Sequence, residues 1–376
     1  MIARSSNAEV AVIGAGVIGL AVALELSMRG ANVRAFDSGN PGGAASWAGA
    51  GMLAPYLEEP PEALAGFLAH SLAMYATYAR DVYAASGIDP ELQLNGILRV
   101  ARDEWEMERL RERSTRLAGA GVASTVLDSR ATVELEPAID PHISGGLLVH
   151  GEGYLDNRRL GRALRRACER AGVRVAEQTA VTRVEADERR VLGLQTSAGF
   201  VAATTVVNAM GAWASQLPGV PDDCVPSVFP VRGQMLALQA PKGLMRHATY
   251  TDDVYVVPRR DGRLLIGATT ERAGFDARTT AEGIHGLLER GLRVAPALRG
   301  FTVSESWAGL RPATDDGLPA IGATTLEGYF LATGHYRNGI LLVPATARLL
   351  ADVIEGKPNA FAGTFALRQE ANSLNV

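Results

Sequence analysis

The chain has 376 residues, of which 47% are hydrophobic and 21% charged, and this is enough for two or three domains around a large apolar core. The formal net charge of −4, without a dense Lys/Arg run, argues against a nucleic-acid-binding protein. The two cysteines, Cys168 and Cys224, stand far apart in the sequence and predict neither a zinc site nor a disulfide framework, which favours a cytoplasmic location.

The N-terminal segment predicts a strand, a tight turn and a helix. The apolar run 9–13 is typical of a buried parallel strand, and a helix over 17–28 would follow it. The turn between them is G-x-G-x-x-G, in which Gly14 permits the turn and Gly16 lets the backbone approach a pyrophosphate. Gly19 lets the helix pack on the strand, and the helix N-terminus would present its N–H groups to phosphate.

A second strand, "NVRAFD", would follow and end on Asp37. Its carboxylate stands where an acidic side chain accepts hydrogen bonds from a ribose 2′-hydroxyl, and it would repel the 2′-phosphate of NADP. The uncharged run 10–24 is too short for a comfortable membrane span and is interrupted by three glycines. We therefore expect neither a transmembrane segment nor a signal peptide here.

Segment 39–55, "GNPGGAASWAGAGMLAP", favours FAD over NAD. Its glycines and alanines allow close backbone approach to a long, flat cofactor, and Ser46 offers a hydroxyl to phosphate. A flexible loop is the alternative, but Trp47, Met52 and Leu53 make the segment too apolar for a mere linker.

The pattern of the remaining chain predicts that it leaves the nucleotide domain and comes back to it more than once. Residues 57–147 are rich in helical spacing, and 158–170 predicts a basic amphipathic helix, interpreted as a solvated face. Residues 204–214 predict another buried parallel strand that returns to the first domain. From 226 the pattern is β-rich and includes a hairpin that turns near 260–262.

Two segments near the C-terminus carry candidate ligand-binding residues. Arg311 is predicted in a Gly/Pro-rich turn among apolar residues, where it is either a surface arginine or a buried anion clamp. The turn 334–339 precedes an amphipathic helix and either caps a core helix or contacts a cofactor. In the second case its backbone N–H groups, the helix N-terminus and Arg337 would stabilise negative charge on that cofactor.

Together these segments resemble the flavin-dependent D-amino-acid oxidase family, and within it the bacterial glycine oxidases. The resemblance covers about residues 9–355 and is carried by "GAGVIGLAVAL", "SWAGAGMLAP", "YVVPRRDGRLLIGAT", "SWAGLRPATDDGLPAIG" and "GHYRNGILLVPAT". It implies an α/β fold in which a Rossmann-like FAD-binding domain of the glutathione-reductase type is interleaved with an α+β substrate domain containing a mostly antiparallel sheet. The expected FAD-binding domain comprises 1–56, 148–215 and 305–376, and the expected substrate-binding domain comprises 57–147 and 216–304.

The resemblance also implies the roles of individual residues. Val17 and Ile18 would lie under the diphosphate, Asp37 and Ser38 at the ribose, Val181 at the adenine, and 335–341 over the isoalloxazine. The cofactor-binding set that it implies is Gly14, Gly16, Val17, Ile18, Gly19, Asp37, Ser38, Ala45, Ser46, Ala50, Gly51, Met52, Val181, Gly334, His335, Tyr336, Arg337, Asn338, Gly339, Ile340 and Leu341.

For the substrate, the resemblance implies that Arg311 pairs with an amino-acid carboxylate, that the Tyr255 hydroxyl also reaches it, and that Arg337 lies beside the pocket. A guanidinium suits this task, since it offers two parallel donors to a carboxylate in a fixed geometry. Two positions depart from the pattern of glycine oxidases, namely Asp253 in place of a histidine and Thr270 in place of a methionine. An acid and a hydroxyl there would favour a larger or more polar amine.

The implied activity is oxidative deamination of glycine or a similar small or N-substituted amino acid, by hydride transfer from Cα to N5 of non-covalently bound FAD. The products would be an imine and, after reoxidation by O2, H2O2, and glycine imine would feed thiamine biosynthesis. No metal is expected, and the resemblance implies a homotetramer. The alternatives are a D-amino-acid or sarcosine-type dehydrogenase that uses another electron acceptor, and a non-catalytic FAD-binding assembly protein.

Overall fold

The computed structural model describes residues 9–56 and 60–367. Residues 1–8, 57–59 and 368–376, which the expected domain ranges include, lie outside the described residues. Eight helices and nineteen strands are described in these ranges. The predicted strand 9–13 and helix 17–28 are confirmed as β1 (Glu9–Ile13) and α1 (Val17–Met28).

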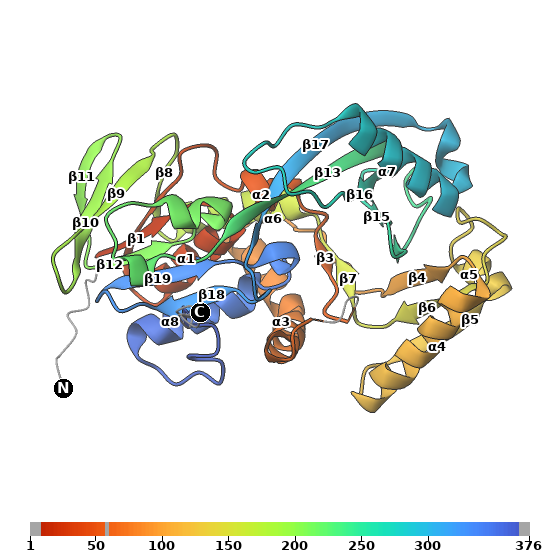
Figure 1. The fold of residues 1–376 in the computed structure, drawn as a ribbon, viewed down its shortest axis with the longest axis horizontal. Coiled ribbons are helices and arrows are strands. Elements are labelled where there is room, and N and C mark those ends of the chain that lie inside the picture. The colour runs from red at the N-terminus through yellow and green to blue at the C-terminus, as the bar shows by residue number, and fades with distance from the viewer. Residues whose placement is uncertain (1–8, 57–59, 368–376) are drawn as a thin grey trace, which may run out of the picture.

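A six-stranded sheet forms one half of the molecule (Figure 1). Its strand order is β18-β19-β12-β1-β2-β8, and all neighbouring pairs are parallel except β18–β19. The other strands are β2 (Asn32–Phe36), β8 (Arg174–Ala176), β12 (Thr205–Asn208), β18 (Ala320–Ala323) and β19 (Tyr329–Thr333). Within the predicted strand 204–214, residues 205–208 return to this sheet as β12, whereas 211–216 form a 3-10 helix.

Helices cover one face of this sheet and a smaller sheet covers the other. Apolar residues of α1, α3 (Glu62–Ser86), α6 (Asn157–Arg170) and α8 (Val343–Glu355) share one core with the sheet. On the opposite face, the antiparallel sheet of β9 (Val181–Ala186), β10 (Val191–Thr196) and β11 (Gly199–Ala202) contributes to a second core with the sheet strands. This three-layer arrangement is the expected nucleotide-binding fold.

An eight-stranded sheet forms the other half, in the order β17-β13-β16-β15-β14-β4-β6-β5. Every neighbouring pair is antiparallel except β14–β4, so the expected mostly antiparallel sheet is confirmed. Its strands are β4 (Ile97–Ala101), β5 (Ser124–Asp128), β6 (Gly145–Val149), β13 (Phe229–Gln239), β14 (Ala248–Tyr250), β15 (Tyr255–Pro258), β16 (Arg263–Gly267) and β17 (Thr302–Ala313). The predicted hairpin is β15–β16.

Helices α4 (Glu104–Gly119), α5 (Ser129–Leu135) and α7 (Ala281–Val294) accompany this sheet, and α7 packs into its core through Leu287. The two halves meet where the short helix α2 (Ala44–Ala48) packs beside β17, and where β3 (Met52–Leu53) pairs with β7 (Gly153–Tyr154). The remaining elements are the short 3-10 helices η1 (Gly211–Gln216), η2 (Asp222–Cys224), η3 (Pro296–Gly300) and η4 (Tyr336–Asn338).

The division into two interleaved domains stays a proposal, and the packing adjusts its boundaries. The expected boundaries at 148 and 305 fall inside β6 and β17, both of which belong to the eight-stranded sheet. Helix α3, expected in the substrate-binding domain, packs in the core of the six-stranded sheet. We therefore propose that α3 belongs with the nucleotide fold and β17 with the other half.

Candidate functional site

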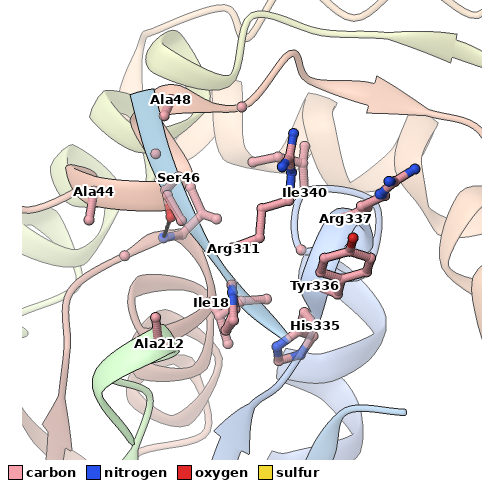
Figure 2. A pocket seen from close by; sticks show the side chains of 18 of the residues that line it. Ile18, Ala44, Ser46, Ala48, Ala212, Arg311, His335, Tyr336, Arg337 and Ile340 are labelled. Carbon is pink, nitrogen blue, oxygen red and sulfur yellow. Dashed lines mark hydrogen bonds between the residues drawn. The ribbon is translucent and has the colours of Figure 1, made fainter. Parts of the chain in front are cut away.

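A cavity of about 1170 Å³ runs between the two halves and is lined by residues from both sheets. Figure 2 shows Ser46 entering it from the side of α2, and Tyr336 and Arg337 entering from the turn before α8. The predicted site residues that line it are Gly14, Gly16, Val17, Ile18, Asp37, Ser38, Ala45, Ser46, Ala50, Gly51, Met52, Val181, Tyr255, Arg311, His335, Tyr336, Arg337, Asn338, Gly339 and Ile340.

Three predicted residues, Gly19, Gly334 and Leu341, do not line this cavity. A Cβ at Gly19 would overlap the carbonyl oxygen of Gly14, so this glycine allows α1 to pack against the turn, as the motif predicts. Gly334 has a φ of +77° and Leu341 is 1% exposed, so these two residues shape the turn rather than the cavity surface.

The N-terminus of α1 faces the cavity with a donor set that suits an anion. Gly14 has a φ of +92°, and a Cβ there would lie 2.5 Å from the carbonyl oxygen of Ala209. The first turn of α1 carries no acidic side chain, and Val17 N–H donates to the Ser46 hydroxyl at 3.0 Å. This arrangement favours phosphate, since the helix dipole and the N–H groups both attract negative charge.

Asp37 lies directly after β2 and is oriented by the backbone. Its two carboxylate oxygens accept hydrogen bonds from Ala15 N–H and Gly39 N–H, each at 2.8 Å. Each oxygen keeps a further lone pair for a ligand hydroxyl. Ser38 and Val181 line the same cavity, and Thr179 N–H donates to the carbonyl oxygen of Asp37 at 2.8 Å, which brings the segment before Val181 beside Asp37.

The small-residue segment, which contains α2 and β3, is anchored from behind by two side chains that the sequence reasoning missed. Asn157 donates through Nδ2 to the carbonyl oxygens of Ser46 at 2.8 Å and Trp47 at 3.0 Å. Arg259 donates to the carbonyl oxygen of Ala50 at 2.7 Å. Arg259 stands directly after the strand β15, within the quoted motif "YVVPRRDGRLLIGAT".

The turn before α8 is fixed to α3. The hydroxyl of Tyr75 donates to the carbonyl oxygen of Ile340, and that of Ser71 donates to the carbonyl oxygen of Leu341 at 2.6 Å. His335 is buried against Thr346, with 3.0 Å between Nε2 and Oγ1. Burial lowers the pKa of His335 to about 3, so its ring is neutral near pH 7.

Arg311 lies in strand β17, so the predicted Gly/Pro-rich turn was wrong at this position. The turn residues follow the strand, and pairing with β13 over its full length overrides the Pro312 signal. The Arg311 guanidinium extends across Gly233 on β13, where a Cβ would overlap it. Arg311 also donates to the carbonyl oxygen of Thr269 at 3.1 Å, which fixes the group at the cavity wall.

Tyr255 and Arg337 line the same cavity as Arg311. Burial raises the pKa of Tyr255, although the charge of Arg311 acts in the opposite direction, so its hydroxyl is protonated near pH 7. Arg337 donates through Nη2 to Thr270 Oγ1 at 3.2 Å. The structure thus brings together two cations and a phenol, a set that can bind a carboxylate.

The two departures from the family pattern also line the cavity. Thr270 holds Arg337, and Asp253 accepts a hydrogen bond from the Thr251 hydroxyl at 2.9 Å and pairs with Arg102 at 3.5 Å. Both side chains therefore lie at the same cavity as Arg311 and Tyr255.

The cavity fits a dinucleotide with a second, smaller ligand. Its volume exceeds the range of about 300–1,000 Å³ that is typical for one small molecule. The N-terminus of α1, the Asp37 carboxylate and the small-residue segment all line it. These groups suit the phosphate, ribose and flat-ring parts of such a ligand.

Other kinds of site are not observed in the described part of the chain. Within residues 9–56 and 60–367 there is no cluster of three or more His, Cys, Asp or Glu side chains that could hold a metal ion. No helix in these ranges is both long and apolar enough to cross a lipid bilayer. Cys168 and Cys224 are both buried and unlinked.

Comparisons with known proteins match this fold over nearly the whole chain. A family profile described as DAO, FAD dependent oxidoreductase, matches residues 9–353. The glycine oxidase of Geobacillus kaustophilus is 35% identical over 373 residues, which cover 98% of each chain. The crystal structure of glycine oxidase from Geobacillus kaustophilus matches with a TM-score of 0.91 at 34% identity, over 97% of this chain and 99% of that one. Iminodiacetate oxidase from Chelativorans sp. BNC1 matches with a TM-score of 0.86 at 26% identity, over 95% and 98% of the two chains.

Proposed function

This chain belongs to the DAO family of FAD-dependent oxidoreductases, and we propose that it catalyses the oxidative deamination of glycine or a similar small or N-substituted amino acid. The observation that carries the proposal is the convergence of Arg311, Tyr255 and Arg337 on one cavity that also contains a dinucleotide site. The products would be an imine and, with O2 as acceptor, H2O2.

We assign FAD to the nucleotide end of the cavity. The N-terminus of α1 would hold the diphosphate, Asp37 and Ser38 the ribose, and Val181 the adenine. Segment 45–52 and the turn 335–340 would bracket the flavin. When bound, the flavin accepts a hydride from the substrate and so supplies the redox chemistry.

The protein residues would bind and orient the substrate. The Arg311 guanidinium can give two parallel hydrogen bonds to a carboxylate, and the protonated Tyr255 hydroxyl can give a third. Because both groups are fixed by strands of the same sheet, the carboxylate would be held in one orientation and Cα would be presented toward the flavin end.

Glycine is the first candidate substrate, and N-substituted glycines are the next. Both structural relatives named above are oxidases of such compounds, since iminodiacetate is a glycine that carries a carboxymethyl group on nitrogen. Asp253 and Thr270 line the cavity and add an acid and a hydroxyl, which would accommodate a polar substituent on the amine.

We also propose a cytoplasmic homo-oligomer. The location is supported by the absence of paired cysteines, and the oligomer, a homotetramer, is supported only by the family resemblance. Light scattering of the purified protein during size-exclusion chromatography would test the second point, and a monomer would contradict it.

The first experiment is an anaerobic absorbance measurement of the purified holoenzyme at the flavin bands, with glycine, sarcosine and iminodiacetate added in turn, and then with air admitted. Bleaching by glycine with rapid recovery in air is the expected result. Bleaching without recovery in air would contradict the use of O2 and would favour a dehydrogenase. A yellow protein that none of these amines bleaches would contradict the proposed substrate class.

A further inference from the structure

Arg259 is a buried cation that does not line the cavity, and the chemistry proposed above does not use it. Its side chain is 2% exposed. Burial lowers its pKa to about 10, because desolvation disfavours the charged form, so the group remains protonated near pH 7. A buried charge costs free energy unless it is paired and hydrogen-bonded, so its partners indicate what it stabilises.

Those partners belong to the wall of the cofactor cavity. Nη2 of Arg259 donates to the carbonyl oxygen of Ala50 at 2.7 Å and to Oδ1 of Asn157 at 3.2 Å. The same Asn157 donates through Nδ2 to the carbonyl oxygens of Ser46 and Trp47. Three carbonyls of one cavity-lining segment therefore depend on these two side chains.

The counter-charge lies on the side away from the cavity wall. Asp156 Oδ2 is 3.9 Å from Nε of Arg259 and 3.1 Å from Nη2 of Arg263, and its other oxygen caps α6 by accepting from Arg159 N–H. Asp156 is 4% exposed and the Arg259 side chain 2%, so these two groups are shielded from water. Shielding strengthens these interactions and fixes their geometry.

The backbone of Arg259 belongs to the other half of the molecule. It closes the β15–β16 hairpin by donating from N–H to the carbonyl oxygen of Arg263 at 2.9 Å, and Tyr255 begins that same hairpin. One residue thus connects the hairpin that carries Tyr255 to the segment that faces the flavin end of the cavity.

We infer that Arg259, together with Asn157, is a positioning residue that holds the flavin-facing segment 45–51 at a fixed spacing from the substrate-binding hairpin. Its guanidinium is suited to this task because its donors lie in one plane and reach the Ala50 carbonyl and Asn157 from a single nitrogen. The inference rests on the assignment of FAD, and only its kinetic test rests on the proposed substrate.

The test compares Arg259→Met and Arg259→Lys with Arg260→Met as a matched control. Arg260 is the adjacent residue, is 50% exposed and pairs with Asp89. For each holoenzyme we would measure the rate of FAD release by flavin fluorescence, the visible flavin spectrum, and kcat and KM for glycine.

We expect Arg259→Met to release FAD about tenfold to a hundredfold faster, because charge-assisted hydrogen bonds to the cavity wall are lost. We expect kcat to fall and KM to change by less than roughly twofold, since Arg311 keeps its hold on the carboxylate. The Arg259→Lys variant keeps the charge without the planar donors and should recover only part of the loss. Arg260→Met should match the wild type in every measurement.

Three results would overturn the inference. Wild-type FAD release, spectrum and kcat in Arg259→Met, with only a lower melting temperature, would make Arg259 a purely structural residue. Wild-type FAD release and kcat in Arg259→Lys would show that Arg259 acts through its charge and not through the geometry of its donors. If Arg259→Met does not fold, Asn157→Ala removes the other anchor, and unchanged FAD release and kcat in that variant would contradict the inference. A protein that does not oxidise glycine would contradict the proposed substrate without changing the FAD-release result.

Discussion

The two halves of the molecule contribute to the site by different physical means. We call the six-stranded sheet, its covering layers and the adjoining segment 45–52 the cofactor region, and the eight-stranded sheet with α4, α5 and α7 the substrate region. The cofactor region presents mainly backbone groups and small residues from a few short segments, such as 14–18 and 45–52. The substrate region presents two long side chains, Tyr255 from the β15–β16 hairpin and Arg311 from β17, which pairs with the sequence-distant strand β13.

The difference predicts which substitutions each region tolerates. In the cofactor region, binding depends on space beside the backbone, so an added Cβ should do more harm than a changed functional group. In the substrate region, binding depends on a guanidinium and a phenol, so loss of one functional group should change KM while FAD stays bound.

The largest expected effect is that of Gly19→Ala in the cofactor region. The new Cβ would overlap the carbonyl oxygen of Gly14, so α1 would have to move away from the turn. We expect the free energy of unfolding to fall by about 3 kcal/mol and bound FAD to be lost. Gly66→Ala is the control, because Gly66 is also helical and has open space at its Cβ, and it should stabilise by about 0.5 kcal/mol. Denaturant unfolding and the FAD content of the purified protein should be measured for both variants. Equal effects of Gly19→Ala and Gly66→Ala would contradict the importance of space at Gly19.

In the substrate region, Arg311→Ala should raise KM for glycine about tenfold to a hundredfold, because charge-assisted hydrogen bonds to the carboxylate are lost. The KM of Arg311→Lys should lie between those of the wild type and Arg311→Ala, since an ammonium keeps the charge but not the two parallel donors. Steady-state kinetics and FAD content together test this. An unchanged KM would remove Arg311 from the carboxylate site.

Gly233→Ala tests the comparison of the two regions further, because it adds a Cβ to a glycine of the substrate region. A Cβ there would displace the Arg311 guanidinium and should raise KM by about tenfold through lost alignment. FAD content should stay at the wild-type level. Gly300→Ala, with open space at its Cβ, is the control. Loss of FAD in Gly233→Ala would contradict the separation of the two regions.

The smallest expected effect concerns the junction of the two regions, where Glu152 precedes β7. Burial raises the pKa of this carboxyl from 4.5 to about 8, although hydrogen bonding by Tyr56 N–H and the charges of Arg113 and Arg99 oppose the shift. The folded state therefore holds one proton more than the unfolded state between these pH values, so stability falls as pH rises through this window and levels off above about 8.

The neutral variant Glu152→Gln should remove this dependence, so that its free energy of unfolding no longer falls between pH 5 and pH 8 through this group. Urea unfolding at several pH values is the measurement. Parallel pH profiles of the two proteins would show that Glu152 does not carry the effect.

The sequence by itself determined much of the cofactor region. The elements β1, the glycine turn and α1 follow from an apolar run, three glycines and a helical pattern within a short stretch, and Asp37 directly follows the next strand. These features are readable because each depends on neighbours close in the chain, namely turn geometry, helix periodicity and the room a Cβ would need. The family motifs indicated which side chains of the substrate region are candidates for substrate binding, but not how these side chains are arranged.

Only the tertiary structure decided how those side chains are held. Arg311 lies in a strand and not in a turn because β17 pairs with β13, and its guanidinium has room because residue 233 of that partner strand is glycine. Arg259 and Arg260 are adjacent in the sequence, yet one is buried against the cofactor wall and the other is exposed. Strand register and burial depend on residues that are distant in the chain, so the local sequence pattern did not predict them at these positions.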